Sequence, residues 1–441
     1  MPQAERGYQS AELLRKAVAL LVLAAPFMYS INLGLVRHKG EAAGPYVSIV
    51  DILTLILTVA VGSALVILRD WRSLRFPASA SIALVLWYGL GLFRLTPDVS
   101  VSRGGLLKET IQLFEYLCLG YALFVFAMNS RRRIGFFMDA LALSCTAVTL
   151  YGLYQLAFTD THPFLLGSTF ENNNLLSAWC AVTAPLLLGW ALATSSWPKK
   201  LWIASLVVAS IPLVLNGWFL IVMALGIILM FSLYGEWSAI TVAAITALVF
   251  GVVFTVSPKE NAQRIVTSIS LYHQLDPSAA RELNRTHVAS ARVRNWQAAL
   301  LTGASRPWTG YGASSYAPAV KENFFFDPKY TERTDKIEAF DVHVDEPNSF
   351  STYLIILVEN GIVGLLILAA LLGAAFRWAG AAAFSDGSVR YLGRGALASL
   401  AVLFAGGQFI NIFERGTAFL SVFVLALAFC LYEQAKGYTD N

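Results

Sequence analysis

The sequence predicts an all-α, polytopic integral membrane protein with about twelve transmembrane helices and one large loop. Hydrophobic residues make up 57% of the 441-residue chain and charged residues only 14%, whereas soluble domains average about 25% charged residues. Apolar runs long enough to cross a bilayer recur along the chain. Lys and Arg gather in alternate short loops, as they do on the cytoplasmic side of membrane proteins.

The predicted spans are apolar runs of about 17 to 25 residues. Residues 1–256 hold the first nine spans, residues 257–347 form the large loop, and residues 348–441 hold the remaining spans. The runs lie near residues 16–36, 46–68, 79–95, 106–127, 135–157, 173–194, 200–215, 217–234, 237–256, 348–376, 391–412 and 416–433.

The first run follows a basic segment, "MPQAERGYQSAELLRK", as the apolar region of a secretory signal does. The run is too long for a signal peptide, and no small-residue cleavage site follows it. We therefore expect a retained first span.

Basic loops set the predicted orientation, because short loops rich in Lys and Arg stay in the cytoplasm. The loops "RDWRSLR", "NSRRRIG", "SSWPKK" and "FRWAGAAAFSDGSVR" carry a basic excess, whereas "FTDTHPFLLGSTFEN" carries none. The N-terminus and the basic loops are therefore expected in the cytoplasm. The small net charge of +4 hides this unequal distribution of basic residues between the two sides. It does not indicate nucleic-acid binding.

The large loop divides its charges between two halves. From Lys259 to Arg306 it has seven Lys or Arg against three Asp or Glu, and from Pro307 to Pro347 four against eight. The segment from Ser278 to Leu301 predicts a helix on which Arg281, Arg285 and Arg292 lie within about 40°. Such a helix can lie on the anionic leaflet with its arginines reaching the headgroups, or it can clamp phosphate groups. The rest of the loop favours the clamp.

Polar residues mark the start of the tenth span. Asn348 is expected to cap it, and Glu359 follows eleven residues later, about 16 Å deeper and on nearly the same face. An ionisable residue at such depth is a functional-site hypothesis. The structural alternative is that Glu359 bonds to a neighbouring helix or stabilises a break at Asn360-Gly361.

Further polar residues lie inside predicted spans and must face the bundle interior or a water-filled cavity. They can line a path for ions, so a transporter remains an alternative. These residues are Asp51, Glu109, Gln112 and Glu115.

Three motifs occur in an order that resembles one family. They are "GSTFENNNLLSAWCAVTAPLLLG", "ARVRNWQAALLTGASRPWTGYG" with its P-x-x-G-x-G signature, and "EPNSFSTYLIILVENGIVGLL" with its E-x-G-x-x-G. Over most of residues 165–375 the chain resembles the O-antigen ligase and polysaccharide polymerase family of bacterial inner membranes.

The resemblance implies an inverting, metal-independent glycosyltransferase that needs no cofactor and acts at the periplasmic face of the inner membrane. Its donor is expected to be a glycan on undecaprenyl diphosphate. Its acceptor is lipid A-core sugar in a ligase, the preferred interpretation, or another lipid-linked glycan in a polymerase. Membrane lipids are the other expected partners, and nucleic acid is not expected. A flippase for lipid-linked glycans is the alternative from another class, but it has no need for clustered Arg and a candidate base.

The chemistry implied by the resemblance assigns roles to particular residues. A diphosphate is already a capable leaving group, so the protein must hold the phosphates, align the acceptor hydroxyl and remove its proton. The planar fork of Arg binds two phosphate oxygens, and Arg292 and Arg294 match the family's Arg before Trp. The other predicted substrate-binding residues are Arg281, Arg285, Asn173, Asn216, Asn348 and Glu359, and the predicted catalytic residues are His343, Asp345 and Glu346.

Two positions depart from the family pattern. Asn216 stands where the family often has Arg, and Pro347 stands where it often has His directly before the Asn. His343 lies five residues before Asn348, so it can act as the base only if the loop folds back. The nearest competing bases are Glu346 and Asp345.

The basic loops generate a topology prediction. Reporters fused after Lys200 and Arg377 are expected to be cytoplasmic, and a reporter near Lys321 periplasmic, because of the Lys and Arg bias of the short loops. Paired alkaline phosphatase and fluorescent-protein fusions measure this. A periplasmic signal from the Arg131–Arg133 loop would overturn the whole assignment.

Overall fold

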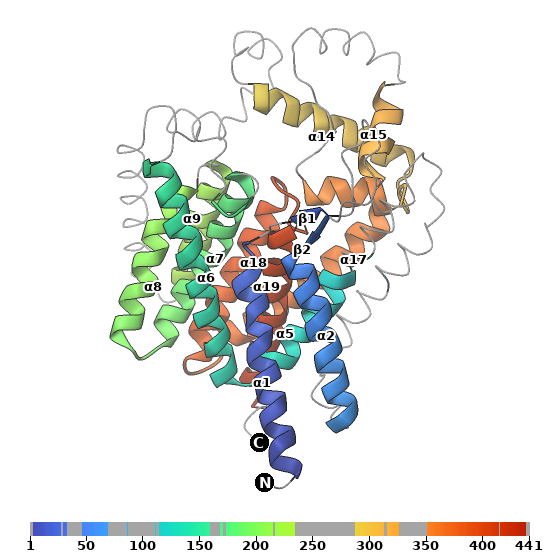
Figure 1. Cartoon of the computed structure of the whole chain (residues 1–441). Helices are drawn as coiled ribbons and strands as arrows, with labels where there is room; N and C mark the ends of the chain where they lie inside the picture. The colour runs from blue at the N-terminus through green and yellow to red at the C-terminus, as the bar shows by residue number, and fades with distance from the viewer. Residues whose placement is uncertain are drawn as a thin grey trace.

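The described part of the chain is a bundle of helices (Figure 1). The computed structural model describes residues 3–27, 30–32, 46–68, 86, 111, 114–158, 168–170, 173–214, 217–233, 287–312, 315–325, 351–413 and 415–437. Both termini lie at one end, which we call the lower end, and helices α14 and α15 lie at the opposite, upper end. The helices are α1 (Gln3–Ala24), α2 (Ile49–Leu68), η2 (Phe114–Gly120), α5 (Tyr121–Ala127), α6 (Arg131–Phe158), α7 (Asn173–Ala193), α8 (Trp197–Ser210), η4 (Ile211–Leu213), α9 (Gly217–Ser232), α14 (His287–Ser305), α15 (Tyr316–Phe325), α17 (Thr352–Ala383), α18 (Val389–Gly406) and α19 (Arg415–Ala435).

The helical membrane class is confirmed. Within the described ranges, five segments are long and apolar enough to cross a membrane, and two shorter apolar helices accompany them. The predicted spans near 79–95 and 237–256, and most of the large loop, lie outside the described residues, so the total of twelve spans stays a prediction. The five segments are Ile49–Ile67, Arg131–Phe158, Asn174–Ala193, Thr352–Ala383 and Thr417–Ala435.

The start of the chain differs from the predicted first span at 16–36. Helix α1 begins earlier, at Gln3, and ends at Ala24, because Pro26 disfavours a helical conformation in the residue before it. Beyond it, strand β1 (Ser30–Asn32) pairs antiparallel with β2 (Tyr46–Ser48). The prediction of an all-α chain therefore missed one short strand pair.

Small residues allow α7 and α18 to pack closely in the middle of the bundle. A Cβ added to Gly395 would lie 2.8 Å from the Pro185 carbonyl oxygen, and one added to Gly189 would lie 2.7 Å from that of Tyr391. The Ser399 hydroxyl donates to the Val182 carbonyl at 2.8 Å. Close backbone contact through small residues is the usual way in which helices associate in lipid.

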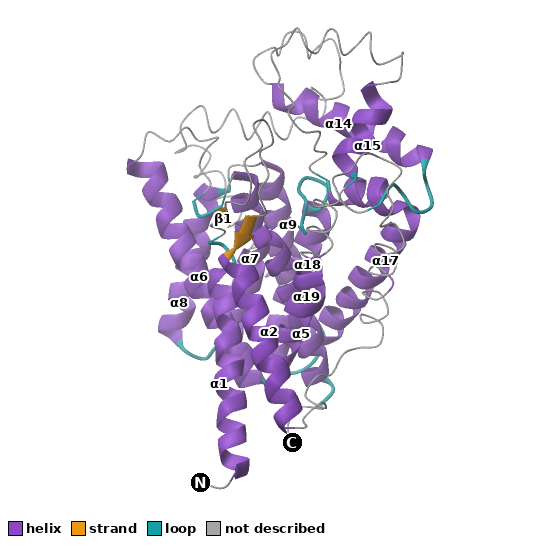
Figure 2. Cartoon of the chain, turned by 45° about the vertical axis from the view of Figure 1, so that its right-hand side comes forward, coloured by secondary structure: helices purple, strands orange, loops and turns teal. Residues whose placement is uncertain are grey.

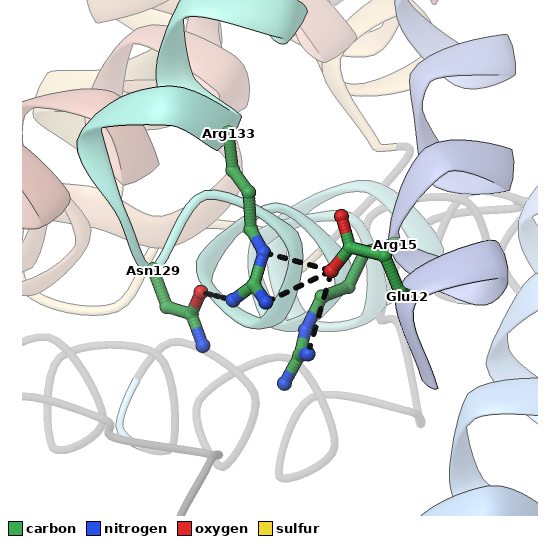
Figure 3. A network of polar contacts seen from close by, with 4 residues as sticks. All are labelled: Glu12, Arg15, Asn129 and Arg133. Atoms are coloured by element: carbon green, nitrogen blue, oxygen red, sulfur yellow. Dashed lines mark hydrogen bonds and ion pairs between the residues drawn. The ribbon is translucent and has the colours of Figure 1, made fainter. Parts of the chain in front are cut away.

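A polar network joins α1 to the start of α6 at the lower end (Figure 3). Arg133 contacts the Glu12 carboxylate through Nη2 at 2.8 Å and Nε at 3.1 Å, and it also donates to the Asn129 side chain. Arg15 lies 3.9 Å from the same carboxylate and stacks over Phe126. Arg133, from the most basic predicted cytoplasmic loop, therefore lies at the end of the bundle that holds both termini.

The upper end of the bundle fixes the start of α17. Ser351 caps the helix by accepting from Leu354 N at 3.5 Å. The backbone N–H of Thr352 donates to the Gly407 carbonyl at 2.8 Å, and its hydroxyl donates to the Ile410 carbonyl at the same distance. The connection between α18 and α19 thus holds the first turn of α17 in place.

Candidate functional site

Helix α14 carries the predicted phosphate clamp. The predicted helix at 278–301 is described from His287 and extends to Ser305. Arg292 and Arg294 lie in its first half, but only their backbone is described, and Arg281 and Arg285 lie outside the described residues. The structure therefore locates the helix that carries Arg292 and Arg294, while phosphate binding by these residues stays a prediction.

The second half of α14 packs against the first half of α17. Ala298, Ala299 and Val358 belong to a small apolar core that is separate from the core of the bundle. Gly303 permits the contact, because an added Cβ would lie 2.8 Å from Leu357 Cγ. Helices α14 and α15 and the start of α17 therefore form a compact unit at the upper end (Figure 2).

The turn after α14 is inserted into the hydrogen-bond ladder of α17. The ladder is broken near Gly361, and the carbonyls of Val358 and Glu359 accept from Tyr311 N and Gly312 N, both at 2.8 Å. In the other direction, Ile362 N donates to Pro307 O at 2.7 Å and Val363 N donates to Trp308 O at 3.2 Å. The turn thus satisfies the backbone groups that would otherwise pair with one another across one helical turn. We call this arrangement of residues 307–312 with 358–363 the interlock.

Two glycines make the interlock possible. Gly310 and Gly361 have φ of +63° and +64°, a region that other L-residues rarely adopt. Gly361 combines this with a ψ of −162°, which is essentially restricted to glycine. An added Cβ would lie 2.4 Å from the Glu359 carbonyl carbon at position 310, and 2.4 Å from the Trp308 carbonyl at position 361. The P-x-x-G-x-G and E-x-G-x-x-G motifs are therefore in backbone contact.

Glu359 has a structural partner in this unit. Its side chain is buried, and its Oε1 accepts from the backbone N–H of Tyr316 at 3.3 Å, in the first turn of α15. A carboxylate at a helix N-terminus also interacts favourably with the helix dipole. This contact matches the structural alternative stated above, while a role of Glu359 in substrate binding stays a prediction.

The expectation that Asn348 caps this helix is wrong, because Ser351 is the cap and the helix begins at Thr352. Glu359 therefore lies about 12 Å along the helix from its cap, two residues before the break at Gly361. The part below the break, Ile362 to Ala383, rises about 33 Å by itself, which is enough to cross a hydrocarbon core of about 30 Å. Glu359 therefore lies just above the part of α17 that can cross the core without it.

Aromatic contacts bring the first half of α14 to the bundle. Trp296 lies two residues after Arg294, and its ring centroid is 6.2 Å from that of Phe409 in the connection between α18 and α19. Phe409 in turn stacks on Trp218, at the start of α9, with centroids 4.5 Å apart. Trp218 follows Asn216 by two residues. The neighbourhoods of the predicted residues Asn216 and Arg294 therefore converge.

The remaining predicted site residues are not described. His343, Asp345, Glu346, Asn348 and Asn216 lie outside the described residues, and Asn173 begins α7 without a described side chain. Their roles stay predictions.

The described ranges show no candidate metal centre among their side chains. There, His, Cys, Asp and Glu do not form groups of three that could hold a metal ion. Two small pockets inside the bundle, one bordered by Trp179 and Cys145 and the other by Phe219 and Ile410, contain none of the predicted site residues.

Sequence reasoning missed the partners in this region. It singled out both glycine motifs, but it did not pair Gly310 with Gly361, or Glu359 with Tyr316. The repeated Gly-x-Gly and Glu-x-Gly patterns are the only sequence signal for a close backbone approach.

Comparison with known proteins identifies a family for part of the chain. Residues 215–369 match the family described as O-Antigen ligase, which confirms the predicted family resemblance. The match includes α9, α14, α15 and the first half of α17. No curated protein sequence matches the chain.

The interlock generates a stability prediction. Gly310→Ala and Gly361→Ala should each lower the free energy of unfolding by about 2 kcal/mol or more, because the left-handed backbone is strained and the added methyl meets backbone atoms. The combined loss in the double variant should fall short of the sum, since both changes disrupt one contact. The thermal midpoint of the purified protein in detergent measures the effect.

Gly373→Ala and Gly380→Ala, in the same helix as Gly361, are the matched controls. Nothing lies within 4 Å of a Cβ added at either position, so alanine should be neutral or stabilising by about 0.5–1 kcal/mol. Midpoints at 310 and 361 that match those of the controls would show that the interlock does not contribute to stability.

Proposed function

We propose, with the O-antigen ligase family match of residues 215–369 as premise, that the protein transfers a glycan from undecaprenyl diphosphate onto a sugar hydroxyl of lipid A-core. The proposal places the upper end of the bundle at the periplasmic face of the inner membrane. Polymerisation of lipid-linked repeats is the competing outcome that the experiment below separates from ligation.

The proposed step is an inverting substitution at the anomeric carbon of the donor. The acceptor oxygen forms a bond to this carbon while the bond from the carbon to the diphosphate oxygen breaks. Undecaprenyl diphosphate leaves with the electron pair, and the acceptor proton passes to a base. The protein must therefore hold two phosphates, align the acceptor and accept one proton, and the proposal requires no metal ion for these tasks.

The aromatic contacts of α9 and α14 with Phe409 support the proposal most directly. Trp218 and Trp296 contact the same ring, so a side chain two residues after Asn216 and one two residues after Arg294 meet at Phe409. A second support is the two-point attachment of α14, through Trp296 at its middle and through the interlock beyond its C-terminal end. A helix held at two points can present arginines to a diphosphate with little loss of conformational freedom on binding.

The clamp prediction is tested in a strain that lacks the gene and is complemented with variants. Arg292→Ala and Arg294→Ala should each abolish or strongly reduce attachment of surface glycan, because each removes a charged, two-pronged phosphate contact. Lys at either position should restore little activity, since it lacks the planar fork. Gel analysis of surface glycan measures the outcome.

The same gels separate the two candidate reactions. Unattached lipid-linked polymer in the deletion strain indicates a lost ligase, whereas single repeats on lipid A-core indicate a lost polymerase. Arg377→Ala, an exposed arginine at the lower end of α17, is the matched control and should keep normal glycan. Normal glycan in both Ala variants, with the protein inserted at the usual level, would show that the arginines do not form a phosphate clamp.

The base is the second prediction of this mechanism. His343→Ala should lower the transfer rate by roughly 10² or more, the usual scale for loss of a general base, because a neutral imidazole with an ordinary pKa near 6.5 can accept the proton at neutral pH. Donor binding should survive, since the arginines remain. Purified protein with lipid-linked donor measures both quantities. Near-normal turnover in His343→Ala together with lost turnover in Glu346→Gln would assign the role to the carboxylate.

A further inference from the structure

The second half of α14 exposes large apolar side chains as well as burying small ones. One face, with Ala299 and Thr302, is buried against α17, as described above. The opposite face carries Leu300 and Leu301, which are 52% and 49% exposed, with Ala304 beside them. A helix at a water-facing surface normally places polar residues on its exposed side. The exposed leucines therefore indicate that this face of α14 meets an apolar environment.

The turn after α14 continues this apolar surface. Trp308 is 69% exposed, although its backbone is fixed by the interlock. The same turn carries Arg306, whose guanidinium lies over the Tyr311 ring at 4.6 Å from its centroid. An exposed Trp next to an Arg is a combination enriched where membrane proteins meet lipid headgroups.

The interlock determines the level of Trp308 relative to the membrane. Its carbonyl accepts from Val363 N at 3.2 Å, and the Pro307 carbonyl accepts from Ile362 N at 2.7 Å. These donors belong to the first turn of the segment that is long enough to cross the bilayer. Just below, Leu366 is 64% exposed, as expected for a side chain that faces lipid. A membrane crossing formed by Ile362–Ala383, the part of the candidate span Thr352–Ala383 below the break, puts Trp308 where the helix enters the hydrocarbon core.

We propose that Leu300, Leu301, Ala304 and Trp308 form an anchor that inserts into the outer leaflet of the membrane. The occupant of this surface is lipid, because the interlock attaches the turn that carries Trp308 to the part of α17 on which Ile362 and Leu366 are exposed. The positive charge of Arg306 complements anionic headgroups.

The anchor also has a consequence that rests on the proposed function. It fixes the height of α14 relative to the membrane surface. Arg292 and Arg294 then stay near the height at which a lipid-linked diphosphate is presented. The anchor itself can be tested without glycan donor or acceptor, so its outcome is independent of any transfer assay.

Spin-label accessibility in lipid nanodiscs tests the anchor. A nitroxide is attached to Trp308→Cys and, as a milder change, to Leu301→Cys, and its collisions with oxygen and with a water-soluble nickel complex are measured by electron paramagnetic resonance. Leu366→Cys is the lipid reference and Ser195→Cys, in an exposed turn at the lower end, is the water reference. Unmodified protein treated in the same way gives the background from Cys118, which is half-buried.

The expected ratio of oxygen to nickel collisions at positions 308 and 301 is several-fold above that at Ser195 and approaches that at Leu366. A ratio equal to that at Ser195 would place the surface in water and overturn the proposal. Low collision rates with both reagents would show that protein covers the surface, from the same chain or from a second copy, and would overturn it as well.

Discussion

The exchange of backbone hydrogen bonds between the 307–312 turn and the break in α17 is the constraint on which the upper end depends. A helix that breaks near a membrane must find partners for the carbonyl and N–H groups that it frees, because lipid offers none and each unpaired group costs several kcal/mol. In this chain the partners come from a turn about fifty residues earlier in the sequence, and all four groups named above are satisfied. The break and the turn therefore stabilise each other, and neither is expected to persist without the other.

This constraint gives α14 a defined place. The interlock fixes the chain just beyond the end of α14, and the contact of Trp296 with Phe409 fixes its middle. Arg294 lies about 16 Å from the end of the helix, on the side of Trp296 that is remote from the interlock. The arginines and Glu359 thus belong to different parts of the upper end. Glu359 holds the start of α15, whereas the arginines proposed to bind phosphate lie in the other half of the unit.

The sequence was sufficient to predict the class of fold and most of the described helices, because long apolar runs and basic loops report directly on the bilayer. It failed where a single residue decides a boundary or a contact. Pro26 ends α1 well before the apolar run ends, and Gly361 breaks α17 inside one. The pairing of β1 with β2 and the approach of Gly310 to Glu359 depend on segments that meet only in three dimensions. In the candidate site, the sequence motifs identified the two segments that form the interlock. The sequence pattern of each segment did not show that it contacts the other.

The packing of α7 against α18 has a consequence for how the protein is made. The hydroxyl of Ser399 reaches Val182 across 217 residues of sequence, and α19 is almost entirely buried although it follows every other described helix. While α18 and α19 are still in the ribosome, the earlier helices are already in the lipid without these two neighbours. Gly189 of α7, which packs against α18 in the folded protein, is then expected to face acyl chains. Assembly of the core must therefore wait until α18 and α19 have been made. A chain that loses α19 would lack the centre of the bundle, so a nonsense mutation just before α19 should be as damaging as one in α1.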